Sequence, residues 1–507
     1  MPTELLISRS AGRTATALRE NGVTVEIRVE DDGAPLAVGA VVKGRVSKIL
    51  PGIQSAFLSV GDERDAFLHA ADLLLPEEAP PAGTEADEAS DPDAEFERSA
   101  DRPSRRASSG PPIEQRLREG RELLVQVARE ALGAKGPRVT SFVTLAGRYL
   151  VHSPRLPHRG VSRRIVDPEA RARLRRMAAS LPAPQGGFIV RTAGAAASPE
   201  AFEADARALV RTWSGVEARA AAARTPSVVH ADLGLFLRTL RDLTTEEVDR
   251  IVVDDDALLE EGRDYLRELD AVLAAKLSRH TGAGSLFDAH GVTADIDKAL
   301  RPRVWLRSGG TLVIEPTEAL VSIDVNTGKF VGSRRQEDTV LRTNLEAAEE
   351  IARQLRLRDL GGIIVVDFID MVSAEHRRQV IDALALALRR DRARTKIAGL
   401  SELGLLQLTR KRTRPGIAAA LTRACDACSG TGRVKTPETV AHEALDEARR
   451  VAAAMGEQEV VVRAHPEVAR AARLQSQVER GPGALAGRLR IVEDPGGPID
   501  RFDVVAG

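Results

Sequence analysis

The clearest pattern of hydrophobic and polar positions lies in the middle of the chain. Two short apolar runs, an amphipathic stretch and a third apolar run predict strands over 311–315 and 319–324, a crossover helix, and a strand over 363–367. The last strand, IIVVD, shows no alternation of apolar and polar residues. We therefore expect it to be covered on both faces, as the strands of parallel sheets are.

The crossover helix carries its own start and stop signals. Thr343 and Glu346 are expected to form an N-terminal capping pair, and Gly361 and Gly362 follow the last turn. Apolar side chains recur at helical spacing and form one face: Leu345, Ala348, Ile351, Ala352 and Leu355. A strand, a helix and a second strand of one sheet form a parallel unit.

Both strands of this unit end on a carboxylate, Asp324 and Asp367. Neighbouring strands lie about 4.8 Å apart, so the two carboxylates would share one edge and repel each other unless a cation separates them or one is protonated. Hard oxygen ligands favour magnesium. Asn326 would face the same side and could hold a carboxylate or a phosphate, as a metal-dependent phosphodiester hydrolase requires. A lone strand-end aspartate usually caps the following loop, and spacing alone leaves that alternative open.

The first third of the chain predicts β structure. Runs over 5–8 and 23–29 indicate a strand pair, and three short alternating runs after Gly39 indicate a small antiparallel barrel. Phe57 and Phe67 fall on this barrel near Lys43, Arg45 and Lys48. The rings could form a stacking surface for nucleic-acid bases while lysines follow the backbone, or they could fill the barrel interior.

The segment 76–112 interrupts the barrel with acidic and then basic residues, rich in Pro, Ala and Ser. It has too few large apolar residues to bury a core, so we expect a disordered loop. Beyond it, FIVRTAG ends a strand on Arg191 and Thr192. This pair could grip a phosphate through charge-assisted hydrogen bonds, or the arginine could lie in an ordinary surface turn.

Signals farther along predict mostly helices. Helices are expected over 231–243 and 257–277, around a strand over 250–253. The three aspartates at 254–256 are interpreted as the N-terminal cap of the second helix. A further helix is expected over 438–455.

Cys425 and Cys428 have C-x-x-C spacing in a Gly-rich segment, as in a zinc knuckle. A structural zinc takes four ligands and the chain has two cysteines, so a second copy of the chain is the simplest source of the other two thiolates. A redox pair, or a third ligand such as His442, remain alternatives.

Composition adds few constraints on function. A chain of 507 residues is too long for one ordinary hydrophobic core, so we expect several domains. Its content of 43% hydrophobic and 29% charged residues is typical of a globular protein. The net charge of −1 means that any RNA contact must come from local patches. No apolar run approaches a membrane span and MPTELLISRSAGRT has no signal-peptide core, so we expect a cytoplasmic protein.

Three segments closely resemble the ribonuclease E/G family: IDVNTG, TNLEAAEEIARQLRLRDLGGIIVVDFIDM and CDACSGTGRVKTPETV. The ending RFDVVAG is similar to the ribonuclease G branch. The resemblance implies that Asp324 and Asp367 hold a catalytic Mg²⁺ and that Asn326 supports them. It also implies a Zn²⁺ shared by Cys425 and Cys428 of two chains, although Asp426 stands where the family usually has proline.

The resemblance assigns RNA contacts as well. Phe57 and Phe67 would lie on the RNA face of the barrel, and Lys43 and Lys135 would contact RNA. A pocket for a 5′ monophosphate would use four residues, the last two through their backbone groups: Arg191, Thr192, Gly147 and Val151.

The fold implied is a multidomain α/β protein. Its parts are, in chain order, a ribonuclease H-like subdomain (1–38), an OB-fold RNA-binding barrel inserted in it (39–141), a 5′-end sensor domain (142–235), the rest of the ribonuclease H-like subdomain (236–299), a DNase I-like catalytic domain (300–421), a zinc link (422–435) and a small C-terminal domain (436–507).

The function implied is a magnesium-dependent endoribonuclease that cuts single-stranded RNA in ribosomal RNA processing and messenger RNA turnover. It would leave a 5′ phosphate and a 3′ hydroxyl, with cleavage favoured by a 5′ monophosphate. We expect a zinc-linked homodimer, compatible with a homotetramer, and no scaffold tail for a degradation complex. The alternative is a non-catalytic zinc-linked dimer that binds RNA.

Overall fold

The computed structural model divides the chain into two compact units, Met1–Ala420 and Leu421–Gly507, which we describe separately. It describes the following residues: 2–33, 36–75, 111–131, 136–157, 159–162, 165–181, 186–242, 248–269, 271–328, 336–412, 414, 416–454, 458–478, 485 and 487–506. Lys135 and nearly all of the insert 76–112 lie outside this set, so the predictions made for them stay predictions.

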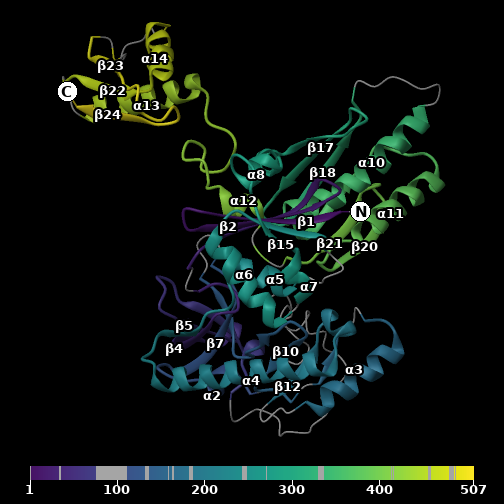
Figure 1. Cartoon of the computed structure of the whole chain (residues 1–507). Coiled ribbons are helices and arrows are strands. Elements are labelled where there is room, and N and C mark those ends of the chain that lie inside the picture. Colours follow the sequence, from purple (N-terminus) through teal and green to yellow (C-terminus); the bar gives the residue numbers. More distant parts are fainter. Residues whose placement is uncertain are drawn as a thin grey trace. The chain divides into compact units, whose positions relative to one another are not determined.

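The first sheet has the strand order β15-β14-β1-β2-β3 (Figure 1). Its strands are β1 (Thr3–Ser10), β2 (Arg13–Glu20), β3 (Val23–Asp31), β14 (Arg250–Val253) and β15 (Leu277–Arg279). The predicted pairing of 5–8 with 23–29 is wrong, because β2 lies between them and pairs with both. The segment RTATALRE buries small side chains such as Thr16 and Ala17, so it lacks the large apolar residues that mark a strand in sequence.

The helices that adjoin this sheet are shorter than predicted. α5 spans Leu235–Asp242, and the expected helix over 257–277 is α6 (Asp256–Leu269), α7 (Ala271–Lys276) and the strand β15. Capping is confirmed at Asp255, whose Oδ1 accepts the Leu258 amide at 2.8 Å. Asp254 instead binds β1, accepting from Ser8 Oγ at 2.5 Å.

A closed five-stranded barrel follows, consistent with an OB-like fold. Its strands are β4 (Val41–Leu50), β5 (Ser55–Ser59), β6 (Ala66–His69), β8 (Arg138–Thr140) and β7 (Glu122–Arg129). They are hydrogen-bonded in that order, and β7 pairs with β4 to close the barrel. β13 (Ser227–His230) pairs antiparallel with the first residues of β4.

A third sheet has the order β11-β12-β10-β9 and packs against two helices. Its strands are β9 (Leu145–Ala146), β10 (Leu150–Ser153), β11 (Gly160–Val161) and β12 (Gly187–Val190), and the helices are α3 (Pro168–Ser180) and α4 (Pro199–Ala222). Phe202, Leu209 and Trp213 lie on the buried face of α4.

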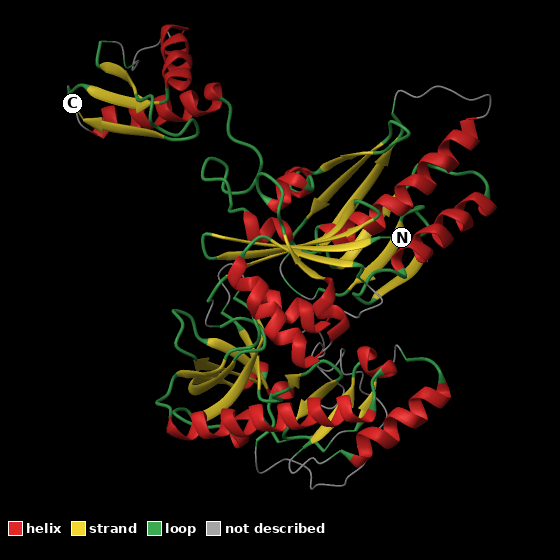
Figure 2. Ribbon diagram, in the orientation of Figure 1, coloured by secondary structure: helices red, strands yellow, loops and turns green. Residues whose placement is uncertain are grey.

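The fourth sheet is mixed, with the order β16-β17-β18-β19-β21-β20. Its strands are β16 (Arg303–Trp305), β17 (Thr311–Pro316), β18 (Leu320–Asn326), β19 (Gly362–Asp367), β20 (Thr395–Leu400) and β21 (Leu406–Arg410). Helices α10 (Gln336–Leu357) and α11 (Ala374–Leu388) lie side by side against one face (Figure 2).

The opposite face of this sheet is open, contrary to the prediction for IIVVD. Ile364 and Val366 are buried under the helices, whereas Ile363 is 53% exposed and Val365 is half-buried. β19 is therefore a strand with one buried and one exposed face. Its sequence does not show this, because β-branched residues are favoured in strands on either face.

The crossover helix also begins earlier than predicted. Thr343 lies inside α10, where its hydroxyl donates to the Thr339 carbonyl at 2.9 Å. Glu346 accepts the Ser308 amide at 3.0 Å and so holds the turn between β16 and β17. The predicted capping pair is wrong, because both side chains bond elsewhere.

The second unit contains a three-stranded sheet with the order β23-β22-β24 and two helices. These are α13 (Pro437–Ala454), α14 (Pro466–Val478), β22 (Val460–Ala464), β23 (Leu489–Glu493) and β24 (Phe502–Ala506). The helix expected over 438–455 is confirmed as α13.

The remaining elements of the described residues are short: η1 (Pro51–Ile53), η2 (Ala70–Asp72), α2 (Ile113–Arg116), η5 (Thr192–Ala196), α8 (Leu286–Ala289), α9 (Val292–Ala299) and α12 (Ile417–Leu421). Within the described ranges, none of the helices is long and apolar enough to cross a bilayer.

Candidate active site

The two strand-end carboxylates lie directly beside each other. β18 and β19 are parallel neighbours, and their register pairs Asp324 with Asp367. Both side chains are exposed on the open face, while Ile323 and Val366 anchor the strands beneath the helices. The sheet spacing therefore places two acids about 5 Å apart at the backbone, on one edge.

Asn326 belongs to the same group. Its Nδ2 donates to Asp324 Oδ2 at 2.7 Å, which orients that carboxylate. No described basic side chain forms an ion pair with Asp324 or Asp367. In the described part of the chain, no three His, Cys, Asp or Glu residues form a metal-binding group. Two carboxylates with no counter-charge among the described residues fit a hard cation that takes its remaining ligands from water and phosphate.

Sequence reasoning missed Asn344, which fixes the loop after Asp367. It is fully buried, its Nδ2 donates to the Ile369 carbonyl at 2.8 Å, and its Oδ1 accepts the Ile369 amide at 3.1 Å. The available signal was an amide four residues before Ala348, on the apolar face of the helix.

The barrel presents its two phenylalanines outward. Phe57 and Phe67 are paired across β5 and β6, with ring centroids 6.0 Å apart and planes at 69°. Both are half-buried and alternate with fully buried Ala56 and Leu68, so the alternative that they fill the interior is wrong. An outward edge-to-face pair leaves ring surface available for stacking.

Two basic residues lie beside these rings, Lys48 and Arg138. Lys48 pairs with Phe57 across β4 and β5, and Arg138 pairs with Phe67 on the other side. Lys43 lies earlier on β4, where its Nζ approaches Glu122 at 3.3 Å and donates to the Ala223 carbonyl at 3.1 Å.

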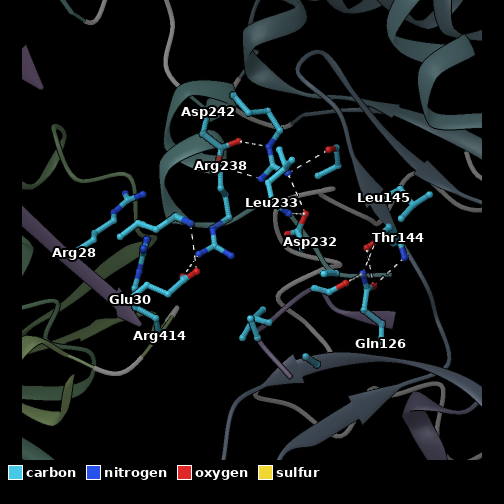
Figure 3. A pocket seen from close by; sticks show the side chains of 18 of the residues that line it. Arg28, Glu30, Gln126, Thr144, Leu145, Asp232, Leu233, Arg238, Asp242 and Arg414 are labelled. Carbon is cyan, nitrogen blue, oxygen red and sulfur yellow. Dashed lines mark hydrogen bonds and ion pairs between the residues drawn. The ribbon is translucent and has the colours of Figure 1, made fainter. Parts of the chain in front are cut away.

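The four residues expected to bind a 5′ phosphate line one large cavity, of about 1390 Å³. Figure 3 shows part of its wall, including Asp242. Arg191 donates to the Gly147 carbonyl at 2.6 Å and pairs with Asp242 at 2.8 Å, and Thr192 Oγ1 lies 3.0 Å from Ser162 Oγ. The guanidinium is therefore held in place inside the cavity.

Asp242 was not predicted, yet it pairs with two arginines of this wall, Arg191 and Arg241. Burial would raise the pKa of its carboxyl, but the guanidinium groups of Arg191 and Arg241 hold that pKa far below its usual range. Asp242 is thus ionised at neutral pH and orients both arginines. Its place at the end of α5 gave no signal in the sequence.

Asp205 of α4 shapes the loop that carries Gly147. It accepts the amides of Arg148, Tyr149 and Leu150 at 3.2, 2.8 and 2.9 Å. A Cβ on Gly147 would lie 2.4 Å from Asp205 Oδ1, which explains the glycine. Burial raises the pKa of Asp205 although these three amides favour its charged form. An acid three residues after buried Phe202 was the available signal.

The barrel connects to this loop through one side chain. Gln126 of β7 donates to the Thr144 carbonyl at 2.8 Å and accepts the Thr144 amide at 3.0 Å, three residues before Gly147 (Figure 3). Because β7 also pairs with β4, this wall of the cavity is tied to the barrel.

In the second unit, Cys425 is exposed and Cys428 is half-buried. The Gly432 amide donates to Cys428 Sγ at 3.3 Å. Backbone amides of Gly432 and Gly430 lower the pKa of the Cys428 thiol. Amides folded over a sulfur favour the thiolate that a zinc ion needs. No third ligand accompanies the two cysteines among the described residues.

Comparisons with known proteins all indicate the same family. The sequence model of the Ribonuclease E/G family matches residues 144–413. Ribonuclease G of Escherichia coli (strain K12) is 41% identical over 475 residues, covering 93% of this chain and 92% of that protein. Ribonuclease G of Haemophilus influenzae is 40% identical over 465 residues, covering 92% of this chain and 91% of that protein. Ribonuclease E of Escherichia coli (strain K12) is 36% identical over 417 residues, covering 82% of this chain and 37% of that protein.

The matched segment contains the sheet with Asp324 and Asp367 and most of the residues that line the cavity. The resemblance seen in the sequence is thereby confirmed, and an RNA-binding dimer without catalysis is not what these relatives indicate. The chain belongs to the ribonuclease E/G family and is an endoribonuclease.

Proposed function

We propose that this endoribonuclease is magnesium-dependent and cuts single-stranded RNA, with Asp324 and Asp367 in its active site. The observation that carries the proposal is their direct pairing at the exposed end of two parallel strands. The two carboxylates would hold one Mg²⁺, and Asn326 would keep Asp324 in the orientation that binds it. When bound, such an ion stabilises the charge that develops on the scissile phosphate and activates the attacking water.

The products would carry a 5′ phosphate and a 3′ hydroxyl. Neither Asp324 nor Asp367 is a nucleophile in this scheme, because an attacking water needs no covalent intermediate with the protein. Ribosomal RNA precursors and messenger RNA are the proposed substrates. The outward rings of Phe57 and Phe67, with Lys48 beside them, would hold the unpaired bases and backbone.

A 5′ monophosphate would bind in the cavity lined by Arg191 and Thr192. The guanidinium of Arg191 is already fixed by Asp242 and the Gly147 carbonyl, so a phosphate meets a preorganised donor. Thr192 would exchange its contact with Ser162 for one to the phosphate. Such a pocket favours RNAs whose first nucleotide carries a single phosphate.

Pairs of chains would be joined by one Zn²⁺ bound to Cys425 and Cys428 of each chain. The support is the presence of two cysteines in the chain and the Gly432 amide, which donates to Cys428 Sγ at 3.3 Å. Four thiolates would complete a tetrahedral site.

Cleavage of a short 5′-monophosphorylated single-stranded RNA tests the catalytic proposal. We expect Asp324→Asn to lower kcat/KM by on the order of 1000-fold, the rate equivalent of several kcal/mol of metal stabilisation. Asp382→Asn is the matched control, because Asp382 is exposed on α11 beneath the other face of the sheet. Equal rates for wild type and Asp324→Asn, or full activity after Mg²⁺ is chelated, would remove the proposal.

A further inference from the structure

Strand β16 carries two exposed side chains beside the candidate active site, Arg303 and Trp305. The register places Arg303 opposite Val313 of β17, and Val313 opposite Asp324 of β18. One step along, Trp305 lies opposite Thr311, which lies opposite Asn326. Directly paired residues in a sheet share one face, so both side chains lie on the open face with the carboxylates.

The distances follow from the sheet. Two strand spacings separate β16 from β18, which puts the backbones of Trp305 and Asn326 about 10 Å apart. An indole extends several ångströms from its backbone, so its ring can meet a nucleotide adjacent to one bound at Asp324.

The position of β16 is fixed by its turn. The Leu306 amide donates to the Gly310 carbonyl at 2.8 Å, and Glu346 of α10 accepts the Ser308 amide at 3.0 Å. Gly328, two residues after Asn326, packs so closely that a Cβ there would lie 1.9 Å from the Gly309 carbonyl oxygen. The turn after β16 and the segment that follows Asn326 are therefore held together by backbone contacts.

Neither side chain has a structural role in the described part of the unit. Trp305 is 70% exposed, whereas Trp213, the other tryptophan of the chain, is 4% exposed. Arg303 is exposed and makes no hydrogen bond or ion pair with the described residues. Tryptophan is enriched among the residues that dominate binding surfaces, and its ring offers a face on which a base can stack.

We propose that Arg303 and Trp305 form a nucleotide subsite of the ribonuclease, in which Trp305 stacks on a base next to the scissile phosphate and Arg303 contacts a backbone phosphate. This inference rests on the proposed role of Asp324 and Asp367. RNA is favoured over a protein partner because an aromatic ring and a cation that pairs with no described acid share one face with the carboxylates that would act on a phosphodiester.

The subsite also complements the charges of the site. Asp324 and Asp367 repel RNA phosphates on their own side, and Arg303 supplies a positive charge two strands away in the same row. Stacking on Trp305 depends little on base identity, because every base has a π face. The subsite thus positions single-stranded RNA and disfavours a paired strand whose bases are already stacked.

Abasic substrates test the stacking contact directly. A short 5′-monophosphorylated RNA with one cleavage site is prepared as a series, each with one abasic nucleotide near the scissile bond. For wild type we expect kcat/KM to fall roughly 5- to 150-fold at one position, the range that corresponds to one stacked base. Trp305→Ala should show a similar loss with intact RNA and no further loss at that position, and Trp305→Phe should retain most of the activity.

Leu386→Ala is the matched control, because Leu386 is 64% exposed on α11, on the covered side of the sheet. It should behave as wild type throughout the series. For Arg303→Ala, binding measured in an Asp367→Asn background should depend less on salt, with a slope of log affinity against log salt about 0.7 smaller.

Three results would overturn the subsite. The first is an active wild type and a Trp305→Ala variant with the same kcat/KM on every substrate. This result would leave the proposed function intact. The second is Trp305→Ala that loses activity equally on all abasic substrates and dissociates into monomers, which would make Trp305 a protein contact. The third concerns tryptophan emission in the Asp367→Asn background. If RNA binding changes the emission of this protein no more than that of the same protein carrying Trp305→Phe, Trp305 does not contact the RNA. Absence of cleavage by wild type would instead overturn the proposed function, and the emission measurement would still decide the subsite.

Discussion

Some functional residues can be predicted from the pattern of a strand, and others are recognised only from their tertiary contacts. Asp324 and Asp367 could be predicted, because each ends an apolar run and the register of parallel strands then makes them neighbours. Asp205 and Asn344 could not be given partners from sequence. Each is a polar group on the apolar face of a helix, and the amides that it bonds come from a loop distant in sequence.

Thr192 gives the cleanest residue-scale test of the 5′-phosphate pocket. Its hydroxyl contacts Ser162 and takes no part in the Arg191–Asp242 pair, so Thr192→Val keeps the wall intact. We expect kcat/KM for 5′-monophosphorylated RNA to fall about 10-fold or more, as loss of a hydrogen bond to a charged group implies, with no change for 5′-hydroxyl RNA. Competition between the two RNAs in one reaction measures the ratio. A Thr192→Val enzyme that keeps the wild-type ratio would exclude this contact. Thr281→Val is the control, because Thr281 is exposed and does not line the cavity.

At the scale of elements, the sequence predicted most strands that contain large apolar residues and missed those that do not. β2 has no apolar signal in the sequence because it buries threonine and alanine. The pattern of β19 predicts a strand covered on both faces, because β-branched residues also occupy its exposed side. The open face matters most for function. It leaves Asp324, Asp367 and Trp305 accessible, and no periodicity distinguishes an open face of valine and isoleucine from a buried one.

His152 gives β10 a pH-dependent stability. It is buried against Phe188 with ring centroids 4.9 Å apart, and burial lowers its pKa to about 4. The unfolded chain would take up a proton near pH 6.5, so unfolding binds a proton between those values and stability falls as the pH drops through that window. The loss is at most about 3 kcal/mol.

Hydrogen exchange of β10 and β12 amides measures this effect. The protection of wild type relative to His152→Phe should decrease as the pH is lowered from about 6.5 to about 4.5. A constant ratio across this range would show that His152 is not kept neutral by the fold.

At the scale of the whole molecule, the chain forms two compact units, and the cysteines lie near the start of the second. Sequence alone predicted a shared metal from ligand count. The amides that lower the pKa of Cys428 support a thiolate site, and a four-thiolate zinc needs two chains. Catalysis and assembly would then depend on separate units.

Zinc content and sedimentation test that assembly. We expect one zinc per two chains, and we expect Cys425→Ser or a strong chelator to yield monomers. Asp426→Asn, which removes only the exposed ion pair with Arg423, should leave dimers intact. One zinc in each monomer would exclude sharing.

The central claim, that Asp324 and Asp367 hold one divalent ion, is tested most directly by exchanging a ligand atom. In Asp367→Cys the oxygen is replaced by a thiolate, which binds Mg²⁺ poorly and softer ions such as Cd²⁺ well. The account predicts that this variant cleaves RNA with Cd²⁺ and hardly with Mg²⁺, while wild type shows the reverse preference. If Asp367→Cys keeps the wild-type preference for Mg²⁺ at an undiminished rate, Asp367 is not a metal ligand and the account is contradicted.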